Sequence, residues 1–170
     1  MNRLSALLAA FALVPSLALA AGTGPLQPVV PMQRVANPTD QEAIANCLAE
    51  STDSPYACIG SIAVVCARLT SGTPGDSAIT CAEREEAIWR SRLETAIAEL
   101  TRSLPPTQLH RFASLQQAWQ TYYAQKCSFL ADEIGTDRAQ RMRQGCELRE
   151  VALRAIDVDR YLRWQKKQRS

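Results

Sequence analysis

The chain has 170 residues, of which 46% are hydrophobic and 21% charged, and its formal net charge is +2. These values are ordinary for a single globular domain and unlike those of a disordered chain. The single histidine, His110, argues against a histidine-rich metal site and against a catalytic centre built from several histidines. We therefore expect neither a metal nor a cofactor.

The first twenty residues have the pattern of a signal peptide. Arg3 gives a positive start, residues 4–19 are mostly apolar, and Ala18 and Ala20 fit the small-residue pattern of a cleavage site. Pro15 interrupts the apolar stretch, whereas a membrane-spanning helix needs ~20 unbroken apolar residues. We expect cleavage after Ala20 and a soluble protein that is periplasmic or secreted. No cysteine lies near this site, so we expect no lipid anchor.

The six cysteines all follow this segment, and an even number in an exported chain predicts structural disulfides. None of them is spaced as C-x-x-C, so the sequence predicts neither a zinc knuckle nor a redox motif. The last two cysteines flank the turn at Gly135, where a bond would join two antiparallel helices. The other four allow three pairings, and we favour the two in which each bond spans a predicted break. The favoured pairs are Cys47–Cys58, Cys66–Cys81 and Cys127–Cys146.

The chain is predicted to consist of an extended linker and a helical body. Residues 21–38 contain four prolines and show no helical periodicity, so we expect a linker there. Thr39 and Glu42 match a capping box, which predicts the start of a first helix that ends at the break at 51–55. Residues 56–69 form a short apolar run that is compatible with a helix, and residues 71–76 have the composition of a loop.

Three longer helices are predicted after this loop. Thr80 and Glu83 form a second capping box, and apolar residues then recur every three or four positions as far as Leu104. Pro105 and Pro106 end that helix and begin the next, which is expected to reach about residue 130. A last helix follows the Gly135 turn. We therefore predict an all-α bundle of about four helices over residues 39–164, followed by a basic tail at 165–170.

The sequence offers no catalytic arrangement. His110 lies beside Arg111 on a predicted helix, which is typical of a solvated histidine, and no nucleophile motif surrounds it. The carboxylates of residues 83–99 all lie along one helix, whereas a glycosidase needs two that face each other across a cleft. We therefore do not expect an enzyme.

Charge is distributed unevenly along the chain. Residues 21–137 contain eight basic and thirteen acidic residues, whereas residues 138–170 contain ten basic and four acidic ones. Cations at the C-terminal end of a helix favour its negative dipole end, and this is our main interpretation of the basic tail. Contact of the tail with an anionic membrane is the alternative, and nucleic acid is not expected for an exported protein.

The order of aromatic, polar and cysteine residues is similar to that of a known family. The residues that carry the similarity are Trp89, Leu93, Gln116, Trp119, Tyr122, Cys127, Cys146 and Arg154. They resemble the N-terminal domain of the exported LprI-type lysozyme inhibitors, over roughly residues 58–162. The resemblance implies a small, helical, disulfide-bonded envelope protein that inhibits a lysozyme. At Trp119 we favour a core residue over an exposed binding anchor.

Four polar positions depart from the family pattern. Aspartate, asparagine, arginine and threonine are common in the family at positions that this chain fills with Arg90, Glu94, Tyr123 and Val151. Because the family's side chains at these positions are polar, the departures concern a shared surface more than the fold.

Two functions from different classes follow. The first is an inhibitor that binds a cationic lysozyme through an acidic surface, since opposite charge speeds association. Its candidate partner-binding residues are Glu83, Glu86, Glu94 and Glu99. The second is a structural or scaffold protein of the periplasm with another envelope partner and no inhibitory activity.

Overall fold

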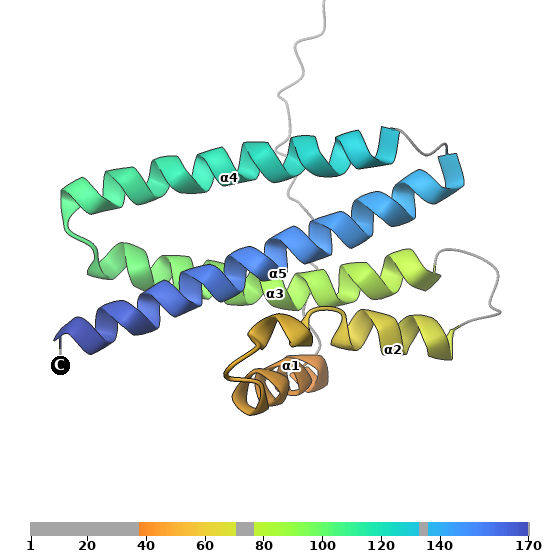
Figure 1. Ribbon diagram of the computed structural model, residues 1–170, viewed down its shortest axis with the longest axis horizontal. Coiled ribbons are helices and arrows are strands. Elements are labelled where there is room, and N and C mark those ends of the chain that lie inside the picture. The colour runs from red at the N-terminus through yellow and green to blue at the C-terminus, as the bar shows by residue number, and fades with distance from the viewer. Residues whose placement is uncertain (1–37, 71–76, 133–135, 170) are drawn as a thin grey trace, which may run out of the picture. The chain divides into compact units, whose positions relative to one another are not determined.

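The protein is all-helical over the residues that the computed structural model describes, which are 38–70, 77–132 and 136–169 (Figure 1). The helices are α1 (Pro38–Glu50), η1 (a 3₁₀-helix, Pro55–Cys58), α2 (Ser61–Leu69), α3 (Ser77–Ser103), α4 (Pro106–Asp132) and α5 (Thr136–Arg169). The predicted fold class is therefore confirmed for these residues, with five α-helices in place of about four. The expected signal peptide, almost all of the expected linker and the loop at 71–76 lie outside the described residues.

The break between η1 and α2 depends on a glycine. Gly60 has φ +92°, a left-handed backbone conformation that residues with a Cβ rarely adopt. It ends the short run that begins at η1, and α2 starts at the next residue. The apolar run at 56–69 is therefore two short helical segments rather than one straight helix.

Two helix ends differ from the prediction, the start of α3 and the end of α5. The second capping box is wrong, because α3 begins at Ser77 and Thr80 already lies in its first turn. α5 begins at Thr136, directly after Gly135, and continues to Arg169. The residues expected as a basic tail are thus mostly the last turns of α5. The prediction at Pro105 and Pro106 is confirmed, since α3 ends at Ser103 and α4 begins at Pro106.

The core lies between α3 and α5, which make the most extensive contact of any two helices described. α3 contributes the buried side chains of Trp89, Leu93 and Leu100 to this core. α5 contributes those of Val151 and Ile156. α5 also contributes alanines at 152 and 155, and such small side chains let two helices approach closely. α2 packs against α3, and α1 closes one end of the core with Ile44.

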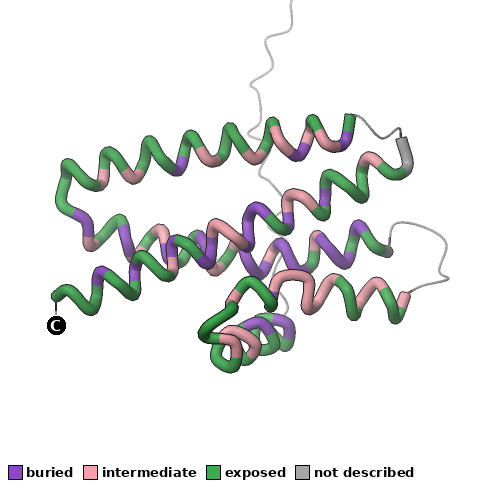
Figure 2. The backbone as a smooth tube through the Cα atoms, in the orientation of Figure 1, coloured by how far each residue is buried: buried purple, intermediate pink, exposed green. Residues whose placement is uncertain are grey.

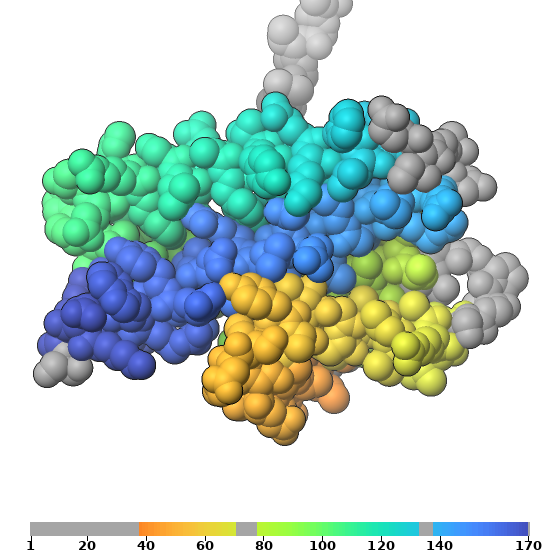
Figure 3. All heavy atoms as spheres, in the orientation of Figure 1, coloured from red at the N-terminus to blue at the C-terminus, as the bar shows by residue number. Residues whose placement is uncertain are grey.

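α4 is the outlying helix of the fold. It packs against α5 and makes little contact with α3, although a short turn connects it to α3. Figure 2 shows that most of its length is exposed, whereas buried residues are concentrated on α3 and along the middle of α5. Figure 3 shows α4 along one edge of the face in view, with α5 beside it.

All six cysteines are paired, each bond joining neighbouring helical segments. The bonds are Cys47–Cys58, Cys66–Cys81 and Cys127–Cys146, with Cα–Cα distances of 5.9, 5.7 and 5.5 Å. These are the pairs that the spacing favoured. They link α1 to η1, α2 to α3 and α4 to α5, so each short or outlying element is tied to its neighbour.

Candidate functional site

The most deeply buried carboxylate of the described residues belongs to Glu85, whose exposed fraction is 0%. Its Oε1 accepts hydrogen bonds from the Gly60 backbone N–H at 2.7 Å and from the Trp89 Nε1–H at 2.9 Å. Its Oε2 accepts backbone N–H groups of Ile62 at 3.0 Å and Ala63 at 2.7 Å. A carboxylate has about four acceptor positions, and all four are filled. Glu85 is therefore a structural cap and is not available for acid–base chemistry.

The cap of Glu85 satisfies the N-terminus of α2. The first backbone N–H groups of a helix have no partner inside the helix, and the positive end of its dipole favours a negative charge. α2 lacks a side-chain cap of its own, because its N-cap residue is Gly60. Glu85, from the middle of the neighbouring α3, supplies the missing acceptor.

A second polar cluster joins α4 to α5. Arg154 on α5 donates from Nε to Oε1 of Gln116 on α4 at 2.7 Å, and its Nη2 donates to the same oxygen. The guanidinium carbon lies 5.9 Å from the ring centre of Trp119, which in turn lies 4.7 Å from the ring of Tyr123. Burial lowers the pKa of Arg154, since desolvation disfavours the charged form. Trp119 is half-buried and packs against the core.

A third cluster surrounds Glu86, which the sequence analysis proposed as a partner-binding residue. Its side chain is buried, accepts a hydrogen bond from Gln144 Nε2 at 2.6 Å and forms an ion pair with Arg90. Burial opposes the charge of Arg90, but its hydrogen bond to Glu86, with a further contribution from nearby Tyr123, raises its pKa overall. Glu86 therefore cannot belong to an exposed acidic surface, because its carboxylate is already enclosed between α3 and α5.

The other three acidic candidates lie on different sides of α3. Glu94 is exposed and has no ion-pair partner among the described residues, and Glu83 is half-buried. They are eleven residues, or about three turns, apart and so share one side of the helix. Glu99 is on the opposite side and binds Lys166 of α5 at 2.7 Å. The four glutamates therefore do not form one surface.

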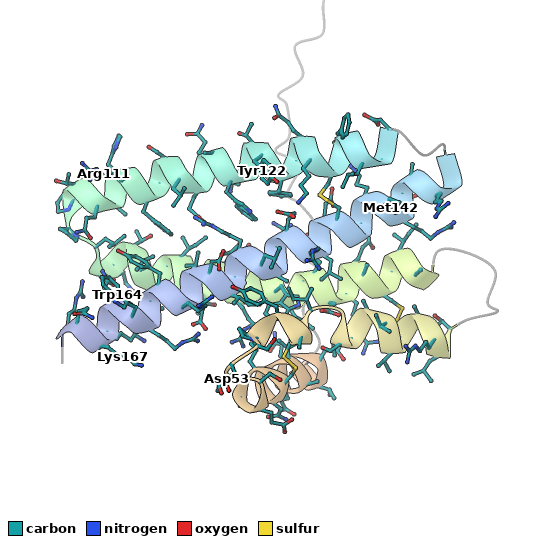
Figure 4. All side chains as sticks on the ribbon, in the orientation of Figure 1. Asp53, Arg111, Tyr122, Met142, Trp164 and Lys167 are labelled. Atoms are coloured by element: carbon teal, nitrogen blue, oxygen red, sulfur yellow. A yellow bond between two sulfur atoms is a disulfide. The ribbon has the colours of Figure 1, made fainter. Side chains whose placement is uncertain are left out.

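Tyr122 and Lys126 mark the exposed side of α4. Lys126 Nζ donates to the buried carboxylate of Glu150 at 2.6 Å and lies 5.6 Å from the ring centre of Tyr122. The hydrogen bond to Glu150 raises the pKa of Lys126. Tyr122 is 55% exposed and lies along α4 in Figure 4, so this residue of the family resemblance lies at the surface. Trp89 and Leu93 by contrast lie in the core.

Two grooves flank the N-terminal half of α4. One, of about 480 Å³, lies between α3 and α4 and is lined by Ile97 and Thr101 on one side and by Phe112 and Gln116 on the other. The second, of about 330 Å³, lies between α4 and α5. Phe112 lines both, so this half of α4 forms a ridge between two depressions. Sequence reasoning did not find either groove, because periodicity does not show how closely two neighbouring helices approach.

The described residues contain neither a cluster of metal ligands nor a membrane-length apolar helix. No group of three or more potential ligands (His, Cys, Asp or Glu) gathers anywhere in the described ranges. His110 is exposed on α4. None of the described helices is long and apolar enough to cross a membrane.

Comparison with known proteins identifies one family. The family described as "Lysozyme inhibitor LprI" matches residues 66–157, from the last turn of α2 to the middle of α5. No curated protein and no solved structure matches the chain. The matched segment contains the Gln116–Arg154 cluster and the residues of α4 that line the two grooves. It also contains the disulfides Cys66–Cys81 and Cys127–Cys146. The match spans more than half of the chain, which therefore belongs to the LprI lysozyme inhibitor family.

Proposed function

We propose that this protein is an exported, non-catalytic binding protein that inhibits a lysozyme by covering part of its surface. The observation that carries the proposal is the family match, which spans all of α3 and α4 and continues along α5 as far as residue 157. The state of Glu85 agrees with a non-catalytic role, since this carboxylate is saturated by four donors. A lysozyme cleft is concave, and an inhibitor that blocks it needs a projecting element such as the ridge of α4.

Export is part of the proposal. Three disulfides link the described helices, and such bonds persist in oxidising compartments and are rare in the cytosol. The N-terminal pattern that ends at Ala20 supports the same conclusion from the sequence. We place the mature protein in the periplasm or outside the cell.

Glu94 is the acidic candidate best placed to meet a cationic lysozyme, since it is exposed and unpaired within the described residues. Exposed charges of opposite sign speed association, and salt screens them. Glu94→Gln should therefore slow association at low salt and have less effect at high salt. Glu99→Gln is the matched control, because Glu99 is already paired with Lys166.

The test is a lysis assay. Oxidised protein is titrated into purified cationic lysozymes acting on bacterial cell walls, at low and high salt, with protein reduced and alkylated beforehand as the control. The proposal predicts a saturable loss of lysis by at least one lysozyme, which the alkylated control does not produce. Full lysis by every lysozyme in the presence of excess oxidised protein would contradict it and favour the scaffold function.

A further inference from the structure

The groove between α3 and α4 has an uncharged lining. Apolar side chains form most of its walls, and hydroxyl and amide groups complete them. Six of these residues are Ile97, Thr101, Leu109, Phe112, Gln117 and Gln120. A surface of this kind favours a peptide segment with an apolar side chain and exposed backbone groups over a charged small molecule.

Gln116, at the α4 wall of this groove, has an unpaired donor. The residue is only 9% exposed, and its Nε2 is buried without a hydrogen-bond acceptor in the described part of the chain. The orientation of the amide is determined by Arg154, which donates twice to Oε1 and requires an oxygen there. A buried donor without an acceptor is unfavourable, so a partner that displaces the atoms covering Nε2 and brings an acceptor to it would be stabilised at this position.

Charge gives the groove a preferred partner. Glu94 precedes Ile97 by three residues and Thr101 by seven, so it lies on the same side of α3 as the groove wall. Its exposed carboxylate is suited to a lysine or arginine at one end of the groove. The α4–α5 groove instead has two cations, Arg111 and Arg154, against one carboxylate, Asp157, in its lining, and that net positive charge is unfavourable for a cationic partner.

We propose that the α3–α4 groove binds an exposed segment of a cationic protein. The Gln116 Nε2–H donates to a carbonyl oxygen of that segment, an apolar side chain of the partner lies against Phe112, and Glu94 pairs with a neighbouring cation. This inference rests on the proposed function, in which the cationic protein is a lysozyme.

Ala113 provides a steric test. It is exposed and lines the groove on α4, so Ala113→Trp fills the groove without altering a buried residue. Ala118→Trp is the matched control, because Ala118 is exposed on the same helix and does not line the groove. Affinity for the lysozyme that the full oxidised chain inhibits is measured by calorimetry. We expect Ala113→Trp to weaken binding by about tenfold or more and Ala118→Trp to leave it within about twofold.

Gln116→Glu tests the donor itself. The carboxylate of the variant still accepts from Arg154, so the variant should keep its melting temperature. It lacks the Nε2–H, so it should lose about tenfold in affinity. Inhibition that survives both Ala113→Trp and Gln116→Glu would overturn the groove while the proposed function stands. A wild-type chain that binds none of the lysozymes would overturn both.

Discussion

At the scale of single residues, the carboxylate of Glu85 decides how α2 is held. This carboxylate accepts hydrogen bonds from the first N–H groups of α2, and Trp89 of the core donates to it as well. Hydrogen bonds to a charged acceptor are stronger than those between neutral groups. Glu85 therefore couples the N-terminus of a short helix to the centre of the core.

Glu85→Gln tests this coupling. The amide keeps one acceptor oxygen and introduces two donors, which then face backbone N–H groups that have lost their acceptor. We expect the free energy of unfolding to fall by about 3 kcal/mol or more, since each bond to a charged group contributes ~1.5–3 kcal/mol. Chemical denaturation of the variant measures the change. Unfolding at the denaturant concentration of the wild type would rule out the cap.

Trp119→Ala tests whether this residue belongs to the core. Its ring packs on Tyr123 and against the core cluster, beside Arg154. We expect the variant to lose about 3 kcal/mol, the lower end of the range for buried tryptophans, because Trp119 is only half-buried. Thermal unfolding without any partner is the measurement. A melting curve that coincides with that of the wild type would make Trp119 a binding residue.

Sequence reasoning identified the residues of these clusters better than their roles. The stripe of Trp89 and Leu93 extends back four residues to Glu85, and a glutamate on an apolar stripe is a signal for a buried cap. Glu86 was misplaced on an exposed surface, because periodicity gives a side of a helix but not which neighbour covers it.

At the scale of elements, α4 is held by a few specific contacts rather than by a broad apolar interface. The Cys127–Cys146 bond, the Lys126–Glu150 ion pair and the Gln116–Arg154 bonds join it to α5. Between these contacts most of the helix faces solvent. Its position therefore depends on few residues, which makes it the element most sensitive to single changes.

Removing the Cys127–Cys146 bond should loosen α4 specifically. The double variant Cys127→Ser, Cys146→Ser opens a loop with a sequence separation of 19 residues. We expect a loss of ~3 kcal/mol in the free energy of unfolding, from the loop-closure model. Hydrogen exchange should accelerate in the C-terminal half of α4 before it does in α3. Equal acceleration in both helices would contradict a local role.

The ion pair between Lys126 and Glu150 should make the free energy of unfolding depend on pH in the alkaline range. The bond to Glu150 raises the pKa of Lys126 in the folded state above the ordinary value of 10.5, so the pair stabilises the fold at lower pH. Lys126→Met should cost about 1 kcal/mol near neutral pH, a small value because Lys126 is partly exposed. The difference between the variant and the wild type should shrink as pH rises above 10.5. A difference that stays constant across this range would show that charge is not its source.

Helix identity was predictable from the sequence, whereas several helix ends were not. Pro105 and Pro106 gave an accurate boundary, because proline fits the first turn of a helix and disrupts its interior. Thr80 did not, since the same spacing of threonine and glutamate also occurs inside a helix, as it does here in α3. The division at Gly60 depends on a backbone conformation that composition alone does not specify.

At the scale of the whole molecule, α3 and α5 form a frame, and the family match covers most of it. Two of the departures from the family pattern meet in this structure, since Tyr123 of α4 lies close enough to Arg90 of α3 to help raise its pKa. Both residues lie within the segment that the family model matches. They give α4 a polar neighbour on α3 although the two helices make little contact.

Charge at this scale explains why the acidic surface was hard to place from sequence. The net negative charge of residues 21–137 suggested one acidic face on α3. In the structure, three of these carboxylates are already bonded within the molecule. Glu85 and Glu86 are buried with hydrogen-bond partners, and Glu99 is paired with Lys166. What remains next to the α3–α4 groove is Glu94, because its side of α3 faces neither α5 nor α2.

Hydrogen exchange of the oxidised chain, with and without the lysozyme that it inhibits, tests the central claim most directly. We predict that the complex slows exchange at residues 97–101 of α3 and 109–120 of α4, which border the groove. Exchange in α2 and in the last turns of α5 should stay unchanged. Protection confined to α1 or α5, with the α4 ridge exchanging as in the free protein, would contradict the claim.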